Sequence, residues 1–330
     1  MLKEYYLGID VGSVSTNLVA IDQNGTLVEK LYLRTSGRPV DTVKKGTLML
    51  TENLGDQASI KAAGTTGSGR KLAAVLLGAD VVKNEITAHA VAARRLYPNV
   101  RTILEIGGQD SKIILMRNGI VYDFAMNTVC AAGTGSFLDR QAARLEIPIE
   151  EFGGYALRAK TPVRIAGRCA VFAESDMIHK QQTGHCTEDI VAGLCEALVR
   201  NYLNNLAKGK EILQPILFQG GVAANIGIVK AFEKELGISI LIPEYYDVMG
   251  AYGAALLAKE ELEINQRETG FLGLGNLKHE FTVQSIDCAG CSNLCEVIKI
   301  CSNNMPIAYW GDRCGKWGDL TANELVQSYK

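Results

Sequence analysis

The chain has 330 residues, of which 47% are hydrophobic and 21% are charged, and its formal net charge is −2. That length allows two domains with cores of their own, and the composition is ordinary for a globular enzyme. A net charge near zero provides no basic field for nucleic acid or an anionic membrane, and no apolar run approaches a membrane span. The N-terminus leads straight into a predicted strand without a signal-peptide pattern, so we predict a cytoplasmic protein with neither nucleic-acid nor membrane partners.

The first hundred residues predict strands alternating with helices. Residues 5–22, YYLGIDVGSVSTNLVAID, predict a strand ending at Asp10, a Gly-Ser turn and a second strand, and residues 24–35 predict a third strand. Helices are predicted over 42–55 and 84–98, the second stopped by Pro98, and a strand with a glycine-rich turn lies between them.

This opening pattern recurs roughly a hundred residues later, which is a typical domain size. Asp10 stands two residues before Gly12, and Glu105 stands two residues before Gly107. In both copies a polar turn, a strand and an Asn-Gly turn signal follow. The repeat therefore predicts an internal duplication, with a strand hairpin at the start of each half.

Later segments complete this division of the chain. Residues 189–210 predict an amphipathic helix, and residues 247–263 predict a helix of small residues. After about residue 265 cysteines and turn residues become frequent, and TGFLGLGN is a predicted linker. The expected units are a first domain over 1–100, completed by the helix at about 247–264, a second domain over 101–246, and a cysteine-rich module over 280–330.

Four glycine turns follow predicted strands and indicate a nucleotide site. Each alone is typical of a tight chain reversal, but glycine also lets backbone N–H groups close on phosphate oxygens. Asp10 and Glu105 are expected to face each other across a cleft, hold Mg²⁺ through water and orient the attacking water. The chain has no G-x-x-x-x-G-K-[ST] motif. The candidate nucleotide contacts are Gly12, Ser13, Ser15, Thr16, Gly107, Gly108, Gln109, Asp110, Lys112, Gly133, Thr134, Gly135, Gly220, Gly221, Val222 and Asn225.

The ordered turns resemble the ATPase motifs of the actin, Hsp70 and sugar-kinase superfold. The match covers most of residues 5–258, in the strings LGIDVGSVSTNLVAID, ILEIGGQDSKIIL, CAAGTGSFLD, ILFQGGVAAN and GAYGAALLA. The resemblance implies an α/β fold with two duplicated ribonuclease H-like domains that bind ATP or ADP with Mg²⁺. Glu105 stands where this superfold usually has Asp, which keeps the charge on a longer arm.

Within that superfold, the strings CAAGTGSFLDRQAARLEIPIEEF, RCAVFAESDMI and IGGQDSK resemble the activators (component A) of 2-hydroxyacyl-CoA dehydratases. The ATP-binding subunits of benzoyl-CoA reductase are related to these activators. The cysteine-bearing extension resembles longer relatives, including the ATP-dependent reductase of double-cubane cluster proteins. The resemblance implies an ATP-hydrolysing homodimer that takes an electron from a ferredoxin or flavodoxin. Its acceptor would be a cluster-bearing partner, either dehydratase-like or a double-cubane cluster protein.

Cys130 and Cys169 each precede a predicted helix start. Each alone is more typical of a buried thiol, but a helix N-terminus favours the thiolate that a metal needs. Two thiolates cannot complete a four-iron cluster, and a two-fold homodimer supplies two more. The family resemblance implies the same arrangement, one [4Fe-4S] cluster bridged by Cys130 and Cys169 of both subunits.

The tail contains a second group of cysteines. Cys288-x2-Cys291-x3-Cys295 and the later Cys314 are typical of a four-thiolate metal site, for Zn²⁺ or a second Fe–S cluster. A structural role, an electron-transfer role and an unmetallated tail all stay open. Cys301 lies in a predicted strand and is interpreted as a spare buried thiol.

Other functional interpretations of the same residues stay open. One is a small-molecule kinase of the sugar-kinase type, which needs a carboxylate base in the cleft and no bridging cluster. Another is a nucleotide-dependent cluster sensor that passes on no electron. Lys112 is predicted either to neutralise phosphate or to solvate its turn, and His89 either to line the cleft or to serve the core. Cys186 and Cys195 are predicted to pack in the core.

Overall fold

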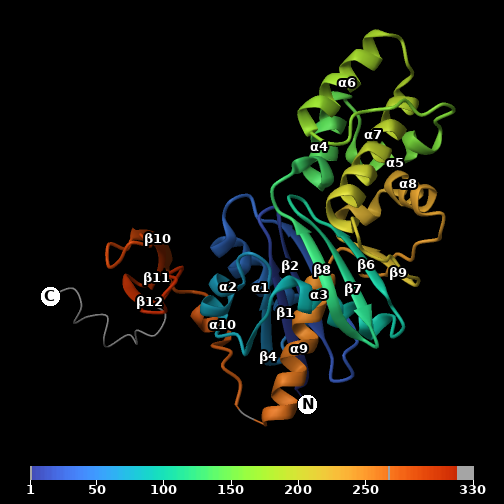
Figure 1. Ribbon diagram of the computed structural model, residues 1–330. Helices are drawn as coiled ribbons and strands as arrows, with labels where there is room; N and C mark the ends of the chain where they lie inside the picture. Colours follow the sequence, from blue (N-terminus) through green and yellow to red (C-terminus); the bar gives the residue numbers. More distant parts are fainter. Residues whose placement is uncertain (1, 267, 318–330) are drawn as a thin grey trace.

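Two sheets with the same strand order form the centre of the molecule. The computed structural model describes residues 2–266 and 268–317. In each sheet three antiparallel strands are followed by a parallel one, which confirms the predicted duplication. The first sheet runs β3 (Leu27–Arg34), β2 (Ser15–Ile21), β1 (Lys3–Val11), β4 (Ala58–Thr66) and β5 (Val81–Val82), and the second runs β8 (Ile120–Asn127), β7 (Ser111–Arg117), β6 (Thr102–Ile106) and β9 (Ile216–Gln219) (Figure 1).

Alternate residues of the central strands enter different cores, because successive side chains point to opposite faces of a sheet. In β6, Leu104 packs with the outer helices of the second sheet, whereas Ile103 faces the space between the two sheets. In β1, Leu7 faces outward and Tyr6 faces inward in the same way. Both faces of each sheet are therefore covered by helices.

Two helices occupy the space between the sheets, namely α3 (Glu85–Leu96) and α9 (Met249–Asn265) (Figure 1). The predicted small-residue helix is α9, which packs mainly on β1 and β4. Gly8 and Gly64 face its backbone so closely that an added Cβ would overlap it. Asn84 begins α3 by accepting a hydrogen bond from the N–H of Thr87. We call the first sheet with α3, α9 and the helices on its outer face the first domain, and the rest up to residue 248 the second domain.

The remaining helices cover the outer faces. α1 (Pro39–Leu54), which ends at Gly55 as predicted, and α2 (Arg70–Leu77) cover the first sheet. Short 3₁₀ turns at Ala131–Gly133 and Gly221–Ala224 follow β8 and β9, and a π-helical turn at Leu203–Ala207 ends the long helix of the second domain. The second sheet is covered by α4 (Gly135–Arg144), α5 (Ile149–Leu157), α6 (Ala170–Gln182), α7 (Thr187–Tyr202) and α8 (Ile226–Leu236).

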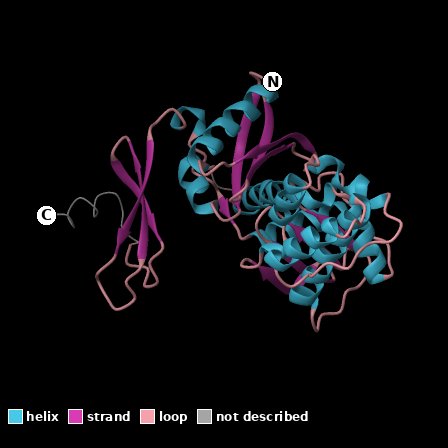
Figure 2. Ribbon diagram, turned by 90° about the horizontal axis from the view of Figure 1, so that it is seen from above, coloured by secondary structure: helices cyan, strands magenta, loops and turns pink. Residues whose placement is uncertain are grey.

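The cysteine-bearing segment forms a separate three-stranded antiparallel sheet beside the first domain (Figure 2). The segment predicted as a linker is anchored, because Asp80 accepts hydrogen bonds from Thr269 and from the Gly270 backbone. Ile300 joins the apolar core around α1 and α2. No described helix is both long and apolar enough to cross a membrane. The elements of the module are α10 (Gly273–Asn276), β10 (Phe281–Asp287), β11 (Glu296–Ser302) and β12 (Met305–Trp310), and residues 318–330 of the predicted module lie outside the described residues.

Candidate functional site

Two adjoining cavities lie between the domains. The inner cavity has a volume of about 250 Å³ and is lined mainly by polar residues. The outer cavity has a volume of about 490 Å³ and is more apolar. Both are lined by Val14, Tyr32, Gly107, Gly108 and Gly221. A small polar chamber that opens into a larger apolar one has the size and polarity to take a phosphorylated ligand of nucleotide dimensions.

The inner cavity collects the predicted phosphate and magnesium residues from both halves of the chain. Asp10 lies near the end of β1 opposite Asn17, and Glu105 lies near the end of β6 opposite Lys112. The duplication thus places the two acidic residues at equivalent positions of the two sheets. The predicted residues that line this cavity are Asp10, Gly12, Ser13, Ser15, Glu105, Gly107, Gly108, Gln109, Asp110, Lys112, Gly220 and Gly221.

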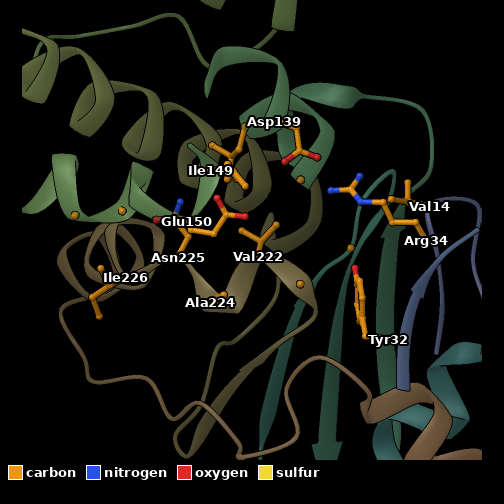
Figure 3. Close-up of a pocket in the computed structure, with 17 residues that line it drawn as sticks. Val14, Tyr32, Arg34, Asp139, Ile149, Glu150, Val222, Ala224, Asn225 and Ile226 are labelled. Carbon is orange, nitrogen blue, oxygen red and sulfur yellow. The ribbon is translucent and has the colours of Figure 1, made fainter. Parts of the chain in front are cut away.

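The outer cavity is built from side chains of both domains (Figure 3). Tyr32 and Arg34 come from β3, and in Figure 3 the Arg34 guanidinium points toward Asp139 of α4. Asn225 begins α8 by accepting a hydrogen bond from the Ile228 N–H. Its Nδ2 is buried without a hydrogen-bond partner among the described residues. This orphaned donor fits a ligand with an acceptor atom, because a buried donor left unpaired is costly. Of the predicted nucleotide contacts, Gly107, Gly108, Gly135, Gly221, Val222 and Asn225 line the outer cavity.

Lys112 is the centre of an ionic cluster at the floor of the inner cavity. Its side chain is 2% exposed, and Nζ lies 2.9 Å from carboxylate oxygens of Glu105 and Asp110 and 2.7 Å from Glu85. Burial opposes the charged form, but these carboxylates raise the pKa of Lys112 above its usual range. Of the two predicted roles, solvation of the turn is therefore wrong, because the ammonium is buried among carboxylates.

Asp10 and Glu105 hold protons more tightly than ordinary carboxyls. Burial, reinforced by the nearby charge of Glu85, raises the pKa of Asp10 to about 7. Burial also raises the pKa of Glu105 to about 8, although Lys112 opposes this shift. Gly67 and Gly250 crowd Asp10 so closely that a Cβ at either position would overlap its carboxylate. The site therefore holds acidic groups that release their protons more readily when a divalent cation binds.

Three predicted nucleotide contacts line neither cavity. Thr16 is buried and its hydroxyl pairs with that of Thr35, because alternation along β2 turns it away from the cavity. Gly133 packs against Asn201, and the Thr134 hydroxyl donates to the Ala131 carbonyl. From the Gly-Thr-Gly run, only Gly135 reaches the cavity wall.

The start of α4 is hydrogen-bonded to the predicted phosphate-binding turn of the second domain. The N–H of Gly135 donates to the Gly107 carbonyl at 2.9 Å, and the N–H of Ser136 donates to the Gly108 carbonyl at 2.8 Å. The hydroxyl of Ser136 also donates to the Gly108 carbonyl. These bonds couple the position of α4 to the wall shared by both cavities.

Cys130 and Cys169 lie close together at the opposite end of that segment. Each is the residue before a helical turn, Cys130 before Ala131–Gly133 and Cys169 before α6. The Sγ of Cys130 lies 3.9 Å from the carbonyl oxygen of Arg168, and 3.8 Å from Nδ2 of Asn201. Both thiols are half-buried. The structure thus brings the two predicted cluster ligands together at the surface.

The tail cysteines lie at one end of the module sheet but are not gathered into a single site. Within the described residues, no group of three His, Cys, Asp or Glu side chains could hold a metal ion. Cys288 donates its N–H to the Cys295 carbonyl at 2.8 Å, while Cys291 and Cys314 are exposed. Cys301 is buried in β11, in agreement with its interpretation as a packed thiol.

Sequence reasoning missed Glu85 altogether and left His89 undecided. Both lie on α3 and line the inner cavity, where Nδ1 of His89 is 2.7 Å from Nε2 of Gln219. Burial and the charge of Lys112 lower the pKa of His89 to about 3, so its ring is neutral. The core prediction is right for Cys195 and wrong for Cys186, which is exposed because it begins α7 at a helix terminus.

Sequence comparison places the chain among ATPases. The profile of the BadF/BadG/BcrA/BcrD ATPase family matches residues 7–258. The chain is 34% identical over 270 residues to the 2-hydroxyisocaproyl-CoA dehydratase activator of Clostridioides difficile. This match covers 80% of this chain and 98% of that protein. It is 35% identical over 260 residues to the (R)-2-hydroxyglutaryl-CoA dehydratase activating ATPase of Acidaminococcus fermentans, covering 77% and 96%.

Structural comparison agrees with this placement. Component A of the Acidaminococcus fermentans (R)-2-hydroxyglutaryl-CoA dehydratase has a TM-score of 0.73 at 33% identity, covering 78% of this chain and 99% of that chain. The Clostridium difficile 2-hydroxyisocaproyl-CoA dehydratase activator with bound ADPNP has a TM-score of 0.72 at 32% identity, covering 79% and 97%. A glucokinase of the ROK family from Streptomyces griseus shares the fold at 13% identity and a TM-score of 0.51, covering 78% and 99%.

The family profile ends before the cysteine-bearing module begins. The sequence and structure matches together confirm both the predicted superfold and the predicted family resemblance. The chain therefore belongs to the BadF/BadG/BcrA/BcrD ATPase family.

Proposed function

We propose that this chain is an ATP-hydrolysing electron donor that works as a cytoplasmic homodimer with one bridging [4Fe-4S] cluster. It takes an electron from a ferredoxin or flavodoxin and delivers it to a cluster-bearing partner, either dehydratase-like or a double-cubane cluster protein. One observation carries the proposal. The segment 130–136 has a candidate cluster ligand, Cys130, at one end and is hydrogen-bonded at the other end to the cavity turn of Gly107 and Gly108.

The two cavities fit a magnesium nucleotide. The glycine turns would close on the phosphates, and Nδ2 of Asn225 would donate to the nucleoside. Asp10 and Glu105 would hold Mg²⁺ through water, and Asp10 would orient the attacking water. When bound, Mg²⁺ supplies positive charge that neutralises the phosphate oxygens. The similarity to dehydratase-activating ATPases supports this assignment.

The surface around the two cysteines fits half of a shared cluster site. Cys130 and Cys169 supply two thiols at helix starts, where thiolates are favoured. Val129, Val171 and Phe172 beside them are 95%, 68% and 66% exposed. Apolar side chains so exposed mark a surface that a partner covers, and a second copy would bring the two missing thiolates. When bound, the cluster supplies a one-electron carrier.

Nucleotide occupancy would act on the cysteines through backbone hydrogen bonds. Any displacement of the Gly107 and Gly108 turn would be passed to Gly135 and Ser136, and from there to Cys130. Asn201 would move with it, because its Nδ2 donates to the Gly167 carbonyl at 2.6 Å and contacts the Cys130 thiol. Hydrogen bonding and solvent exposure at the ligands set the reduction potential of a cluster.

The direct test combines the anaerobically purified homodimer with a 2-hydroxyacyl-CoA dehydratase and an excess of reduced ferredoxin. We expect the dehydratase to be reduced only when ATP is hydrolysed, and not with a non-hydrolysable analogue. Phosphorylation of a sugar without any ATP-dependent reduction would instead establish the kinase alternative. A bound cluster without electron delivery to either class of acceptor would establish the sensor alternative.

Protons should compete with Mg²⁺ at this site. Since the pKa values of Asp10 and Glu105 lie at about 7 and about 8, both carboxyls are protonated below those values. Mg²⁺ needs them ionised, so Mg²⁺-dependent ADP affinity should rise between pH ~6 and pH ~8, by up to about tenfold per unit for each proton released. Calorimetric titration in two buffers of different ionisation enthalpy measures the released protons, and a pH-independent affinity without proton release would contradict the assignment.

The tail cysteines Cys288, Cys291, Cys295 and Cys314, which the described structure does not gather into one site, are proposed to come together around one structural Zn²⁺ or a second Fe–S cluster when the metal binds. They stand at the same end of the module sheet, before or after β10, β11 and β12. The indole N–H of Trp317 donates to the Cys288 Sγ at 3.2 Å, and this hydrogen bond lowers the pKa of the Cys288 thiol. Such N–H donors stabilise a thiolate, the form that binds metal.

Metal analysis of the full chain tests this second site. We expect the Cys291→Ala variant to lose all metal beyond the bridging cluster, and the matched Cys301→Ala variant to keep it, because Cys301 is buried in β11 away from that end. Zinc without additional sulfide would establish the ion, and iron with sulfide the cluster. Equal metal content in both variants would contradict the site.

A further inference from the structure

One ion pair of the Lys112 cluster crosses from one domain to the other. Glu105 and Asp110 belong to the second domain, as does Lys112. Glu85 belongs to α3, which packs on α9 of the first domain. Its Oε2 lies 2.7 Å from Nζ of Lys112, and the two side chains are 17% and 2% exposed. A charge pair so shielded from solvent is much stronger than an exposed one.

A second polar contact crosses the boundary one helical turn later. His89 lies four residues after Glu85, so both side chains project from the same face of α3. The His89 ring contacts the amide of Gln219, and both residues are buried. Gln219 directly precedes Gly220, and Lys112 closely follows Gly107 and Gly108. Helix α3 of the first domain therefore contacts the second domain beside two of its glycine turns.

The Lys112 ammonium has more carboxylate partners than it can neutralise. Glu85, Glu105 and Asp110 all contact it, and the charges of Glu85 and Asp110 also act on Asp10. An incoming phosphate offers Lys112 a new anionic partner, and an incoming Mg²⁺ offers the carboxylates a new cation. Among the ion pairs of this cluster, only the Glu85 pair joins the two domains. If Lys112 exchanged Glu85 for a phosphate, this ionic contact between the domains would be lost.

We propose that Glu85 is a positioning residue that ties Lys112 to the first domain while the phosphate site is empty and releases it when magnesium nucleotide enters. This inference rests on the proposed nucleotide site and adds the element that senses its occupancy. Helix α3 is then the part of the first domain that responds to the nucleotide. The response reaches the core between the two sheets, because α3 packs there with α9.

The test compares hydrogen–deuterium exchange of the full-length protein with and without magnesium ADP. In the wild type we expect exchange in the peptide covering α3 to change severalfold on nucleotide binding. In Glu85→Gln the tie is already broken, so the nucleotide-free exchange should match the bound wild type and the response should be lost. Because the nucleotide no longer has to break the tie, the Kd for magnesium ADP should fall severalfold in Glu85→Gln, whereas kcat for ATP hydrolysis should change less than about threefold.

Two further variants separate positioning from folding. Glu85→Asp keeps the charge and should restore at least half of the exchange response. Asp123→Asn removes an ion pair with Lys210 that lies within the second domain, and it should leave the response unchanged. A Glu85→Gln protein that keeps the full α3 response would overturn the inference. If the wild type binds no magnesium ADP, the proposed function fails instead, and the two failures are distinguishable by the wild-type titration alone.

Discussion

Replacing Cys130 by Ala is expected to remove the bridging cluster from the homodimer while nucleotide binding survives. One substitution removes two of four ligands, because the symmetric partner carries the same change. Iron and sulfide per dimer should fall more than about tenfold, since even loss of outer-shell contacts costs 10–100-fold in metal affinity. ADP affinity should stay within about threefold, because Cys130 lines neither cavity. Iron analysis, visible absorption and calorimetry measure these quantities.

The matched control is Cys186→Ala. Cys186 is an exposed cysteine of the second domain that also precedes a helix. Its replacement therefore tests whether every cysteine at a helix start is needed for the cluster. We expect this variant to keep the full cluster. Cys169→Ala should behave like Cys130→Ala, because the Cys130 Sγ approaches the backbone directly before Cys169. A Cys130→Ala dimer that retains its complete cluster would rule out the proposed ligand set.

Replacing Asp10 by Asn is expected to abolish ATP hydrolysis with little loss of nucleotide binding in the absence of Mg²⁺. Asp10 lines the inner cavity, where it would hold Mg²⁺ and orient the water, whereas the outer cavity would hold the nucleoside. Loss of a group that positions or activates water typically costs 10²–10⁴-fold, so kcat should fall at least about 100-fold. Steady-state phosphate release measures kcat, and ADP titration without Mg²⁺ measures binding.

The control for this variant is Asp56→Asn, an exposed carboxylate in the turn before β4. It should hydrolyse ATP at the wild-type rate. Asp10→Asn also removes a carboxyl whose pKa is raised, so the variant should release fewer protons when magnesium ADP binds. Unchanged hydrolysis in Asp10→Asn would contradict the assignment of Asp10 even if the pH dependence of binding were as expected.

The proposed homodimer would also affect the exposed apolar side chains. The side chains of Phe172 and Val171 are largely exposed to solvent, and no described part of the chain covers them. Phe172 lies three residues after Cys169, in the first turn of α6. The proposed dimer would bury this surface together with the cluster, which would also shield the cluster from water and influence its potential.

Sequence patterns by themselves determined the architecture and much of the site. The repeated spacing of Asp10 with Gly12 and of Glu105 with Gly107 predicted an internal duplication with a strand hairpin at the start of each half, and the structure has two sheets of the same order. Most of the residues predicted from the glycine turns after strands line one of the two cavities. Such features are local, because a turn or a strand end depends on residues that are close in sequence.

Only the tertiary structure decided which side chains meet. Glu85 lies in the first turn of α3 and was not predicted as a site residue, yet it contacts Lys112 across the domain boundary. Tyr32 and Arg34 lie on an edge strand and reach the outer cavity only because the second domain stands opposite. Conversely, Thr16 belongs to a nucleotide motif but turns into the core. Contacts between residues far apart in sequence depend on how the domains pack, and local patterns carry no record of that packing.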